Sequence, residues 1–151
     1  MQAVSRSAMW KLLNRQISLG IQYGYGNKPK LGADPSTYKS LDCSAEARQL
    51  LFAGTTGQLI VPDGSFYQHQ WCVQEGLHKV DYQDIGKYGY GRVFWAFYNP
   101  PTPLVGHTWI IDGTKFRSLE SRGHAGPSSR PWNDPTLIRI VTSCYEIPCL
   151  P

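Results

Sequence analysis

The chain has 151 residues, of which 41% are hydrophobic and 17% are charged, and its formal net charge is +4 at pH 7. This length suits one domain with its own core, so we expect a single domain over residues 1–151. The apolar content excludes an intrinsically disordered chain, and the low charge content disfavours a coiled coil. No apolar run approaches 18 residues, so we expect no membrane insertion. The positive residues are scattered and no nucleic-acid motif is present, so nucleic acid is not an expected partner.

The predicted elements change from helices to strands along the chain. Helical spacing of apolar residues predicts helices over residues 5–19, 43–52 and 65–76. The glycine- and proline-rich stretch 23–40 is expected to be irregular. Strands are expected at residues 92–98, 107–112, 115–121 and 138–145, with a tight turn at 112–114. Helices followed by strands indicate an α+β fold in which N-terminal helices pack on a central antiparallel β-sheet.

A cysteine lies at the predicted start of the second helix. Asp42 is a suitable N-cap residue, and Cys43 follows it in the first turn. The positive end of the helix dipole stabilises a thiolate there, which makes Cys43 a candidate nucleophile. A small buried core cysteine is the alternative reading.

A nucleophilic cysteine needs a base, and the chain has four histidines: His69, His78, His107 and His124. His107 is the leading candidate because it begins a predicted strand after Gly106. On that strand His107, Trp109 and Ile111 share one face.

The predicted hairpin suggests a third group that would orient the base. A two-residue turn, at either of its two possible positions, puts Glu120 on the same face as His107, directly opposite or diagonal to it. A three-residue loop would put Leu119 there instead. Pairing Ile111 with Phe116 is more favourable than exposing Phe116 and burying Leu119, so Glu120 is the expected third member.

The four cysteines are Cys43, Cys72, Cys144 and Cys149, too few and too unevenly spaced for a disulfide framework. A pair between Cys144 and Cys149 stays open. A zinc site built from His69, Cys72 and His78 matches no standard spacing, so we expect neither metal nor cofactor.

Several segments, in this order, resemble the NlpC-type cell-wall peptidases, a papain-like family. The segments are Tyr23-Gly24-Tyr25-Gly26, Asp42-Cys43-Ser44, Gly91-Arg92-Val93-Phe94, Gly106-His107-Thr108-Trp109 and Leu119-Glu120-Ser121. The resemblance implies a papain-like fold and a cysteine peptidase that hydrolyses amide bonds in peptidoglycan stem peptides, usually between γ-D-glutamate and a diamino acid. The peptidoglycan peptide is therefore the expected partner.

The resemblance also implies roles for single residues. Cys43 would attack the carbonyl, His107 would act as base and then acid, and Glu120 would hold the imidazole. The Cys43 N–H and the Tyr23 hydroxyl would stabilise the oxyanion. Asp42 and Ser44 match positions that face the N-terminal side of the peptide.

The sequence departs from the family pattern at four positions. Ala45 replaces a glycine after the Asp-Cys-Ser triplet, and Arg92 replaces an acidic residue. Trp109 replaces a small residue, and we expect it to narrow the substrate cleft. The third catalytic position is often histidine in the family, so His124 is the alternative to Glu120.

The N-terminus lacks the apolar core of a secretory signal. We therefore expect a phage endolysin or a tail-borne wall hydrolase, made in the cytoplasm and delivered by phage lysis or by the phage particle. The alternatives are an intracellular papain-like amidase or acyltransferase and a non-catalytic phage tail module of the same fold.

Overall fold

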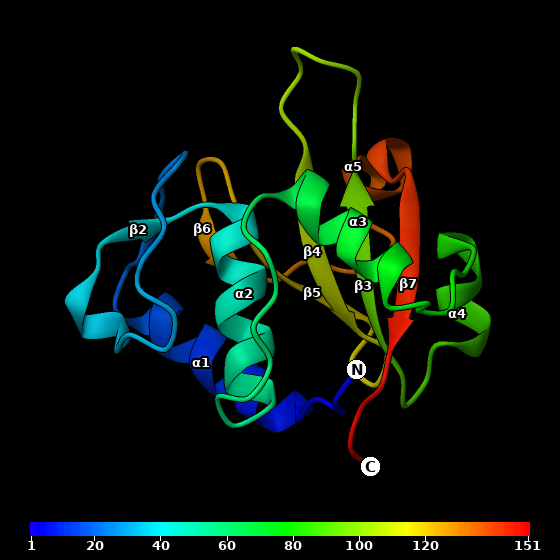
Figure 1. Ribbon diagram of the computed structural model, residues 1–151, viewed down its shortest axis with the longest axis horizontal. Coiled ribbons are helices and arrows are strands. Elements are labelled where there is room, and N and C mark those ends of the chain that lie inside the picture. The colour runs from blue at the N-terminus through cyan, green and yellow to red at the C-terminus, as the bar shows by residue number, and fades with distance from the viewer.

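Five strands form an antiparallel sheet in the computed structural model, which describes residues 1–151 (Figure 1). The spatial order is β6-β5-β4-β3-β7, so β3, β4, β5 and β6 follow one another across the sheet and β7 closes the other edge. The strands are β3 (Val93–Tyr98), β4 (His107–Asp112), β5 (Arg117–Arg122), β6 (Gly126–Ser128) and β7 (Ser143–Ile147). This arrangement confirms the expected α+β class with a central antiparallel sheet.

Helices α1 (Arg6–Ser18), α2 (Cys43–Gly54) and α3 (Ser65–Gln74) contribute to the layer on one side of the sheet, and α2 and α3 lie in front of it in Figure 1. The side chain of Ser5 caps α1 by accepting a hydrogen bond from Ala8 N–H. Met9 and Leu13, one helical turn apart, are fully buried. Burial of each such side chain contributes roughly 1.5–3 kcal/mol, which holds the helix on the core.

Successive residues of β3 alternate between two hydrophobic clusters because neighbouring side chains of a strand point to opposite faces. Val93, Trp95 and Phe97 belong to the larger cluster, which includes residues of α1 and α2. Phe94 and Ala96 belong to a second cluster on the other face. The sheet is buried on both sides, which explains the nearly continuous apolar sequence of β3.

The stretch before α2 is mostly irregular, as expected, but short elements hold its ends in place. β1 (Gln22–Tyr23) and β2 (Ser40–Leu41) form a parallel pair, and a 3-10 turn spans Pro35–Thr37. Tyr23 pairs with Leu41, the residue just before Asp42. This pairing places the Tyr23 backbone next to the start of α2.

The hairpin between β4 and β5 differs from the predicted tight turn. Asp112 pairs with Arg117, so the loop between them has four residues. Ile111 pairs with Ser118, and the predicted pairing with Phe116 is wrong because Phe116 lies in the loop at a φ of 53°. The loop has an even number of residues, as the predicted turn does, so the expected faces of the two strands are preserved.

The C-terminal region contains elements that the sequence did not predict. Residues 138–140, expected to begin the last strand, instead end helix α5 (Pro135–Ile140). Asp134 caps this helix and proline occupies its first position, a typical helix start. Residues 126–128, for which the sequence predicted no element, form β6 and pair with β5. A 3-10 turn at Tyr82–Asp84 and the one-turn helix α4 (Ile85–Tyr88) were also missed.

No helix combines the length and the apolar character that crossing a bilayer requires. The two ends of the chain lie close together at the bottom of Figure 1. A hydrogen bond from Val4 N–H to the Pro148 carbonyl, 2.9 Å long, joins the two terminal segments.

Candidate active site

Cys43 occupies the first position of α2. The N-cap Asp42 accepts a hydrogen bond of 2.8 Å from Ala45 N–H through Oδ1, which fixes the first turn. Cys43 is buried, at 8% exposure, but it lines a surface cleft of about 380 Å³. As the first residue of the helix, it has a backbone N–H with no partner inside the helix.

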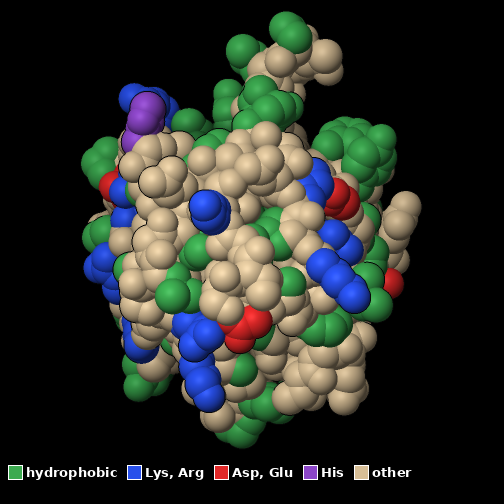
Figure 2. Space-filling view, turned by 90° about the vertical axis from the view of Figure 1, so that its left-hand side faces the viewer, with side chains coloured by type: hydrophobic (Ala, Val, Ile, Leu, Met, Phe, Trp, Pro, Cys, Tyr) green, Lys and Arg blue, Asp and Glu red, His purple; other side chains and the backbone are tan.

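The cleft beside Cys43 has largely aromatic and aliphatic walls. Phe66 and Tyr67, at the start of α3, contribute one part, and residues 103–106 of the β3–β4 loop contribute another. This loop projects from the top of the molecule in Figure 1. In Figure 2 the projection at the top carries hydrophobic side chains on its surface. The cleft therefore has a raised apolar rim.

His107 lies at the start of β4, directly after Gly106, which lines the same cleft as Cys43. Its Nε2 lies 2.7 Å from Oε2 of Glu120 on β5. The ring stacks on Trp109, with 5.3 Å between ring centroids. The hydrogen bond and the stacking fix the ring orientation, and they leave Nδ1 as the nitrogen available to Cys43.

Glu120 is held by two further side chains, one of which the sequence gave no reason to select. Arg130 donates from Nε to Oε1 at 2.7 Å and from its terminal nitrogen Nη2 to Oε2 at 3.1 Å. The Ser118 hydroxyl donates to Oε1 at 2.7 Å. Arg130 lies ten residues beyond Glu120 in a segment for which the sequence predicted no element, so only the structure reveals the contact. The carboxylate is completely buried and fully hydrogen-bonded by these neighbours.

The electrostatics of this pair favour a charged imidazole. Burial alone lowers the pKa of His107, but its interactions with the side chains of Cys43 and Glu120 outweigh burial and raise the pKa to about 9. Burial opposes ionisation of Glu120, yet the hydrogen bonds from His107 and Arg130 keep its pKa well below the ordinary value. At neutral pH the ring therefore carries a proton on both nitrogens, and Nε2–H donates to the carboxylate.

Two buried hydrogen bonds connect the elements that carry these groups. The Ser121 hydroxyl, next to Glu120, donates to the Leu41 carbonyl at 3.0 Å. Gln68 of α3 donates from Nε2 to the Ser44 carbonyl at 2.8 Å. The end of β5 and the middle of α3 are thus both attached to the segment that contains Cys43, which fixes the geometry of the cleft floor.

Tyr23, the expected oxyanion donor, lines the cleft together with Cys43. Burial raises the pKa of the Tyr23 hydroxyl to about 12, with smaller contributions from Cys43, Asp42 and Tyr25. The hydroxyl therefore stays protonated and can donate a hydrogen bond over the whole neutral range.

Asp42 and Ser44, expected to face the substrate, also line the cleft, but a lysine bridges them. Lys28 Nζ lies 2.9 Å from Asp42 Oδ2 and 3.0 Å from Ser44 Oγ. It also lies 2.9 Å from Asp63 Oδ1. The sequence gave no sign of this cluster because its three charged members are far apart along the chain.

The expectation that Trp109 narrows the cleft is wrong. Trp109 is fully buried behind the His107 ring, and its Nε1 donates to the Tyr82 hydroxyl at 3.2 Å. It belongs to the second hydrophobic cluster. His107, the first residue of β4, is partly exposed, whereas every later residue of the strand is buried. Its position supports the imidazole from behind instead of contacting a substrate.

The remaining histidines and cysteines lie outside this group. His124 is exposed in the turn between β5 and β6, and His69 shares a hydrogen bond of 2.9 Å with the Tyr145 hydroxyl. All four cysteines are free thiols. No three side chains among His, Cys, Asp and Glu gather in the manner of a metal site.

The protein has an α+β fold in which a cysteine at the start of a helix lies beside a histidine that is hydrogen-bonded to a buried carboxylate. No family model matches the sequence, and no curated protein matches it either. Solved structures do match the fold, as follows.

An NLP/P60-family protein similar to lipoprotein, from Staphylococcus aureus, superposes with a TM-score of 0.59 at 11% identity, over 99% of this chain and 44% of that one. An NlpC/P60 family protein from Bacillus cereus gives a TM-score of 0.54 at 16% identity, over 88% of this chain and 39% of that one. The peptidoglycan hydrolase RipB from Mycobacterium tuberculosis gives 0.50 at 21% identity, over 93% of this chain and 66% of that one.

The chain therefore has the fold of the NlpC/P60 proteins, which confirms the resemblance seen in the sequence at the level of fold. It spans less than half the length of the first two proteins, 44% and 39%.

Proposed function

We propose that the chain is a cysteine hydrolase that cleaves amide bonds in peptidoglycan stem peptides. The observation that carries the proposal is the set of contacts around His107. One ring nitrogen is bound by the buried Glu120, and the interaction with Cys43 raises the pKa of the ring. A cysteine that is activated by an imidazole, which a carboxylate in turn orients, is the arrangement that thiol-dependent acyl transfer requires.

The proposed reaction begins with attack of the Cys43 sulfur on the amide carbonyl. The C–S bond forms as the carbonyl π electrons move to oxygen, and in this proposal the Cys43 N–H and the Tyr23 hydroxyl stabilise that negative charge. Collapse of the intermediate breaks the C–N bond, and His107 gives its proton to the leaving amine. Water then attacks the thioester, and neutral His107 accepts its proton. The C–S bond breaks, which releases the acid and restores the Cys43 thiolate and the His107 imidazolium.

Peptidoglycan is the proposed substrate because RipB, a peptidoglycan hydrolase, shares the fold over 93% of this chain. The net charge of +4 also favours attraction to an anionic polymer surface. We propose the bond between γ-D-glutamate and the diamino acid, as the sequence resemblance implies.

Digestion of purified sacculi tests this function. Fragments released by the parent protein and by Cys43→Ala are compared by mass spectrometry. We expect stem-peptide fragments from the parent only, and their masses identify the bond. Release of the same fragments by both proteins, or by neither, would contradict the proposal.

A further inference from the structure

Lys28 is held at the mouth of the cleft by three oxygen-bearing side chains. Its ammonium group contacts Asp42, Ser44 and Asp63 at distances of 2.9–3.0 Å. Its side chain is only 34% exposed. Burial disfavours the charged form, but the hydrogen bonds to Asp42 and Asp63 outweigh it and raise the pKa of Lys28. The lysine therefore remains a cation at any pH at which the enzyme would work.

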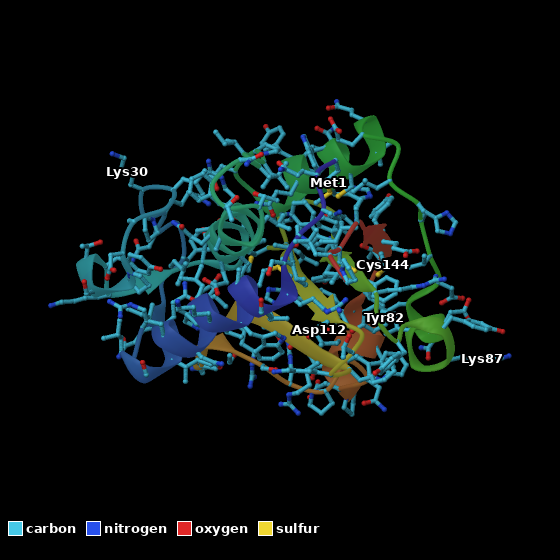
Figure 3. All side chains as sticks on the ribbon, turned by 90° about the horizontal axis from the view of Figure 1, so that it is seen from below. Met1, Lys30, Tyr82, Lys87, Asp112 and Cys144 are labelled. Atoms are coloured by element: carbon cyan, nitrogen blue, oxygen red, sulfur yellow. The ribbon has the colours of Figure 1, made fainter.

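Backbone hydrogen bonds fix the position of the loop that carries Lys28. Asp42 N–H donates to the Asn27 carbonyl at 3.1 Å, and Gly24 N–H donates to the Leu41 carbonyl at 3.2 Å. These bonds attach the loop that carries Lys28 to the segment leading into α2. Lys28 is therefore a fixed part of the cleft wall, whereas Lys30, two residues on, points away from the body of the protein (Figure 3).

Lys28 completes the hydrogen bonding of the one carboxylate that lines the cleft. Asp42 Oδ1 already accepts from Ala45 N–H and from the Ser44 hydroxyl, and Oδ2 accepts from Lys28. Asp63, the other partner of Lys28, does not line the cleft. A positively charged group entering beside Cys43 would find Asp42 Oδ2 already bound by Lys28 and would meet the lysine ammonium.

We propose that Lys28 is a specificity residue that closes the Asp42 and Ser44 side of the cleft to cationic groups. The substrate segment bound there is uncharged or anionic, as in an acylated or internal peptide, and is not a free ammonium terminus. The aromatic and aliphatic residues along the rest of the cleft suit an uncharged segment. This inference rests on the proposed function for its substrate, but its test does not depend on hydrolysis.

The test measures the charge preference of covalent labelling at Cys43. Cationic 2-aminoethyl and anionic 2-sulfonatoethyl methanethiosulfonate are compared, and the rate at the Cys43 peptide is followed by mass spectrometry. Rates are divided by those of 2-mercaptoethanol, which corrects for the intrinsic reactivity of each reagent. The variants are Lys28→Gln and Lys28→Met, and the matched control is Lys30→Gln, which removes an outward-pointing lysine of the same loop.

In the parent we expect the cationic reagent to have no advantage over the anionic one. Removing Lys28 leaves the Asp42 carboxylate unpaired, so the ratio of cationic to anionic rates should rise about tenfold in both variants. Lys30→Gln should keep the parental ratio. A parental preference for the cation, or an unchanged ratio in the folded Lys28 variants, would overturn the proposal. Sacculus digestion is a separate measurement, so failure of the proposed function and failure of this inference can be told apart.

Discussion

His107 and Glu120 form a hydrogen bond of 2.7 Å between Nε2 and Oε2 across the β4–β5 hairpin. Ile110 pairs with Leu119, so residues 107 and 120 project from the same face of the hairpin. The carboxylate thereby reaches the ring from behind, and the other ring nitrogen remains free for Cys43.

Replacing His107 by alanine should abolish most turnover without unfolding the protein. The imidazole supplies and accepts the protons of both reaction steps, and such groups typically contribute about 100- to 10,000-fold in rate. The measurement is fragment release from sacculi, with circular dichroism to verify folding. His124→Ala, which changes an exposed histidine in a turn, is the control and should retain activity. Full activity of His107→Ala would refute the assigned role.

Glu120→Gln should lower the pKa of His107 and reduce the rate less than loss of His107 does. The carboxylate contributes to the raised pKa of about 9, so without its charge the ring loses its proton at lower pH. Titration of the imidazole C–H signals by NMR measures this shift directly. Glu146→Gln removes a partly exposed carboxylate from β7 and should leave the His107 titration unchanged. An unaltered titration in Glu120→Gln would contradict the account.

Arg130→Met should destabilise the fold and disturb the orientation of Glu120. Arg130 makes two hydrogen bonds to a completely buried carboxylate, and removing one partner of a buried pair typically costs about 3 kcal/mol. Urea unfolding gives the change in the free energy of unfolding. Arg139→Met, on the exposed face of α5, serves as the control and should cost little. Equal stability of the two variants would show that Arg130 does not hold Glu120.

Glu46 should make the protein less stable as the pH rises. Burial raises its pKa from 4.5 to about 8, although a hydrogen bond from Gln16 partly offsets the effect. Its Oε1 is buried without a hydrogen-bond partner, which favours the uncharged acid. The unfolded chain therefore loses this proton first, and the contribution to stability, complete below pH 4.5, disappears as the pH rises to about 8.

Glu46→Gln tests this dependence because it keeps a neutral group at the same position. Thermal or urea unfolding across this pH range should show a flatter profile for the variant, with a gain on the order of a few kcal/mol at the alkaline end. Glu75→Gln, at an exposed position, should follow the parental profile. If the parent and Glu46→Gln lose stability in parallel, Glu46 is not the group responsible.

The sequence predicted most of the elements that have strong local signals. The first three helices and the strands over 92–98 and 107–112 have clear periodicity or β-branched composition, and the structure places them within a few residues. The C-terminal region was misjudged because the segment from Leu137 to Val141, apolar except for Arg139, suits a helix and a strand equally well. Tertiary packing, together with the Asp134 cap, determines the outcome there.

Only part of the site could be inferred in advance. Cys43 was suggested by the N-cap signal, and Glu120 by its place on the same face of the predicted hairpin as His107. A two-residue and a four-residue loop give the same faces, so the error in loop length did not affect this prediction. Arg130 and Lys28 contact residues that are distant in the sequence, and no local sequence pattern predicts such contacts. Trp109 was misplaced because strand alternation gives the face of a residue but not how deeply that face is buried.

The pH dependence of Cys43 alkylation tests the central claim most directly. Parent and His107→Ala are treated with iodoacetamide from about pH 5 to about pH 9, and each cysteine is followed by mass spectrometry. We expect Cys43 to react much faster in the parent than in the variant, because the His107 ring beside it assists attack by the sulfur. Cys72 and Cys144 should stay unlabelled because burial raises the pKa of both thiols. Labelling of Cys43 that is as slow as that of Cys72, or that is unchanged by loss of His107, would contradict the assignment of this pair as the catalytic centre.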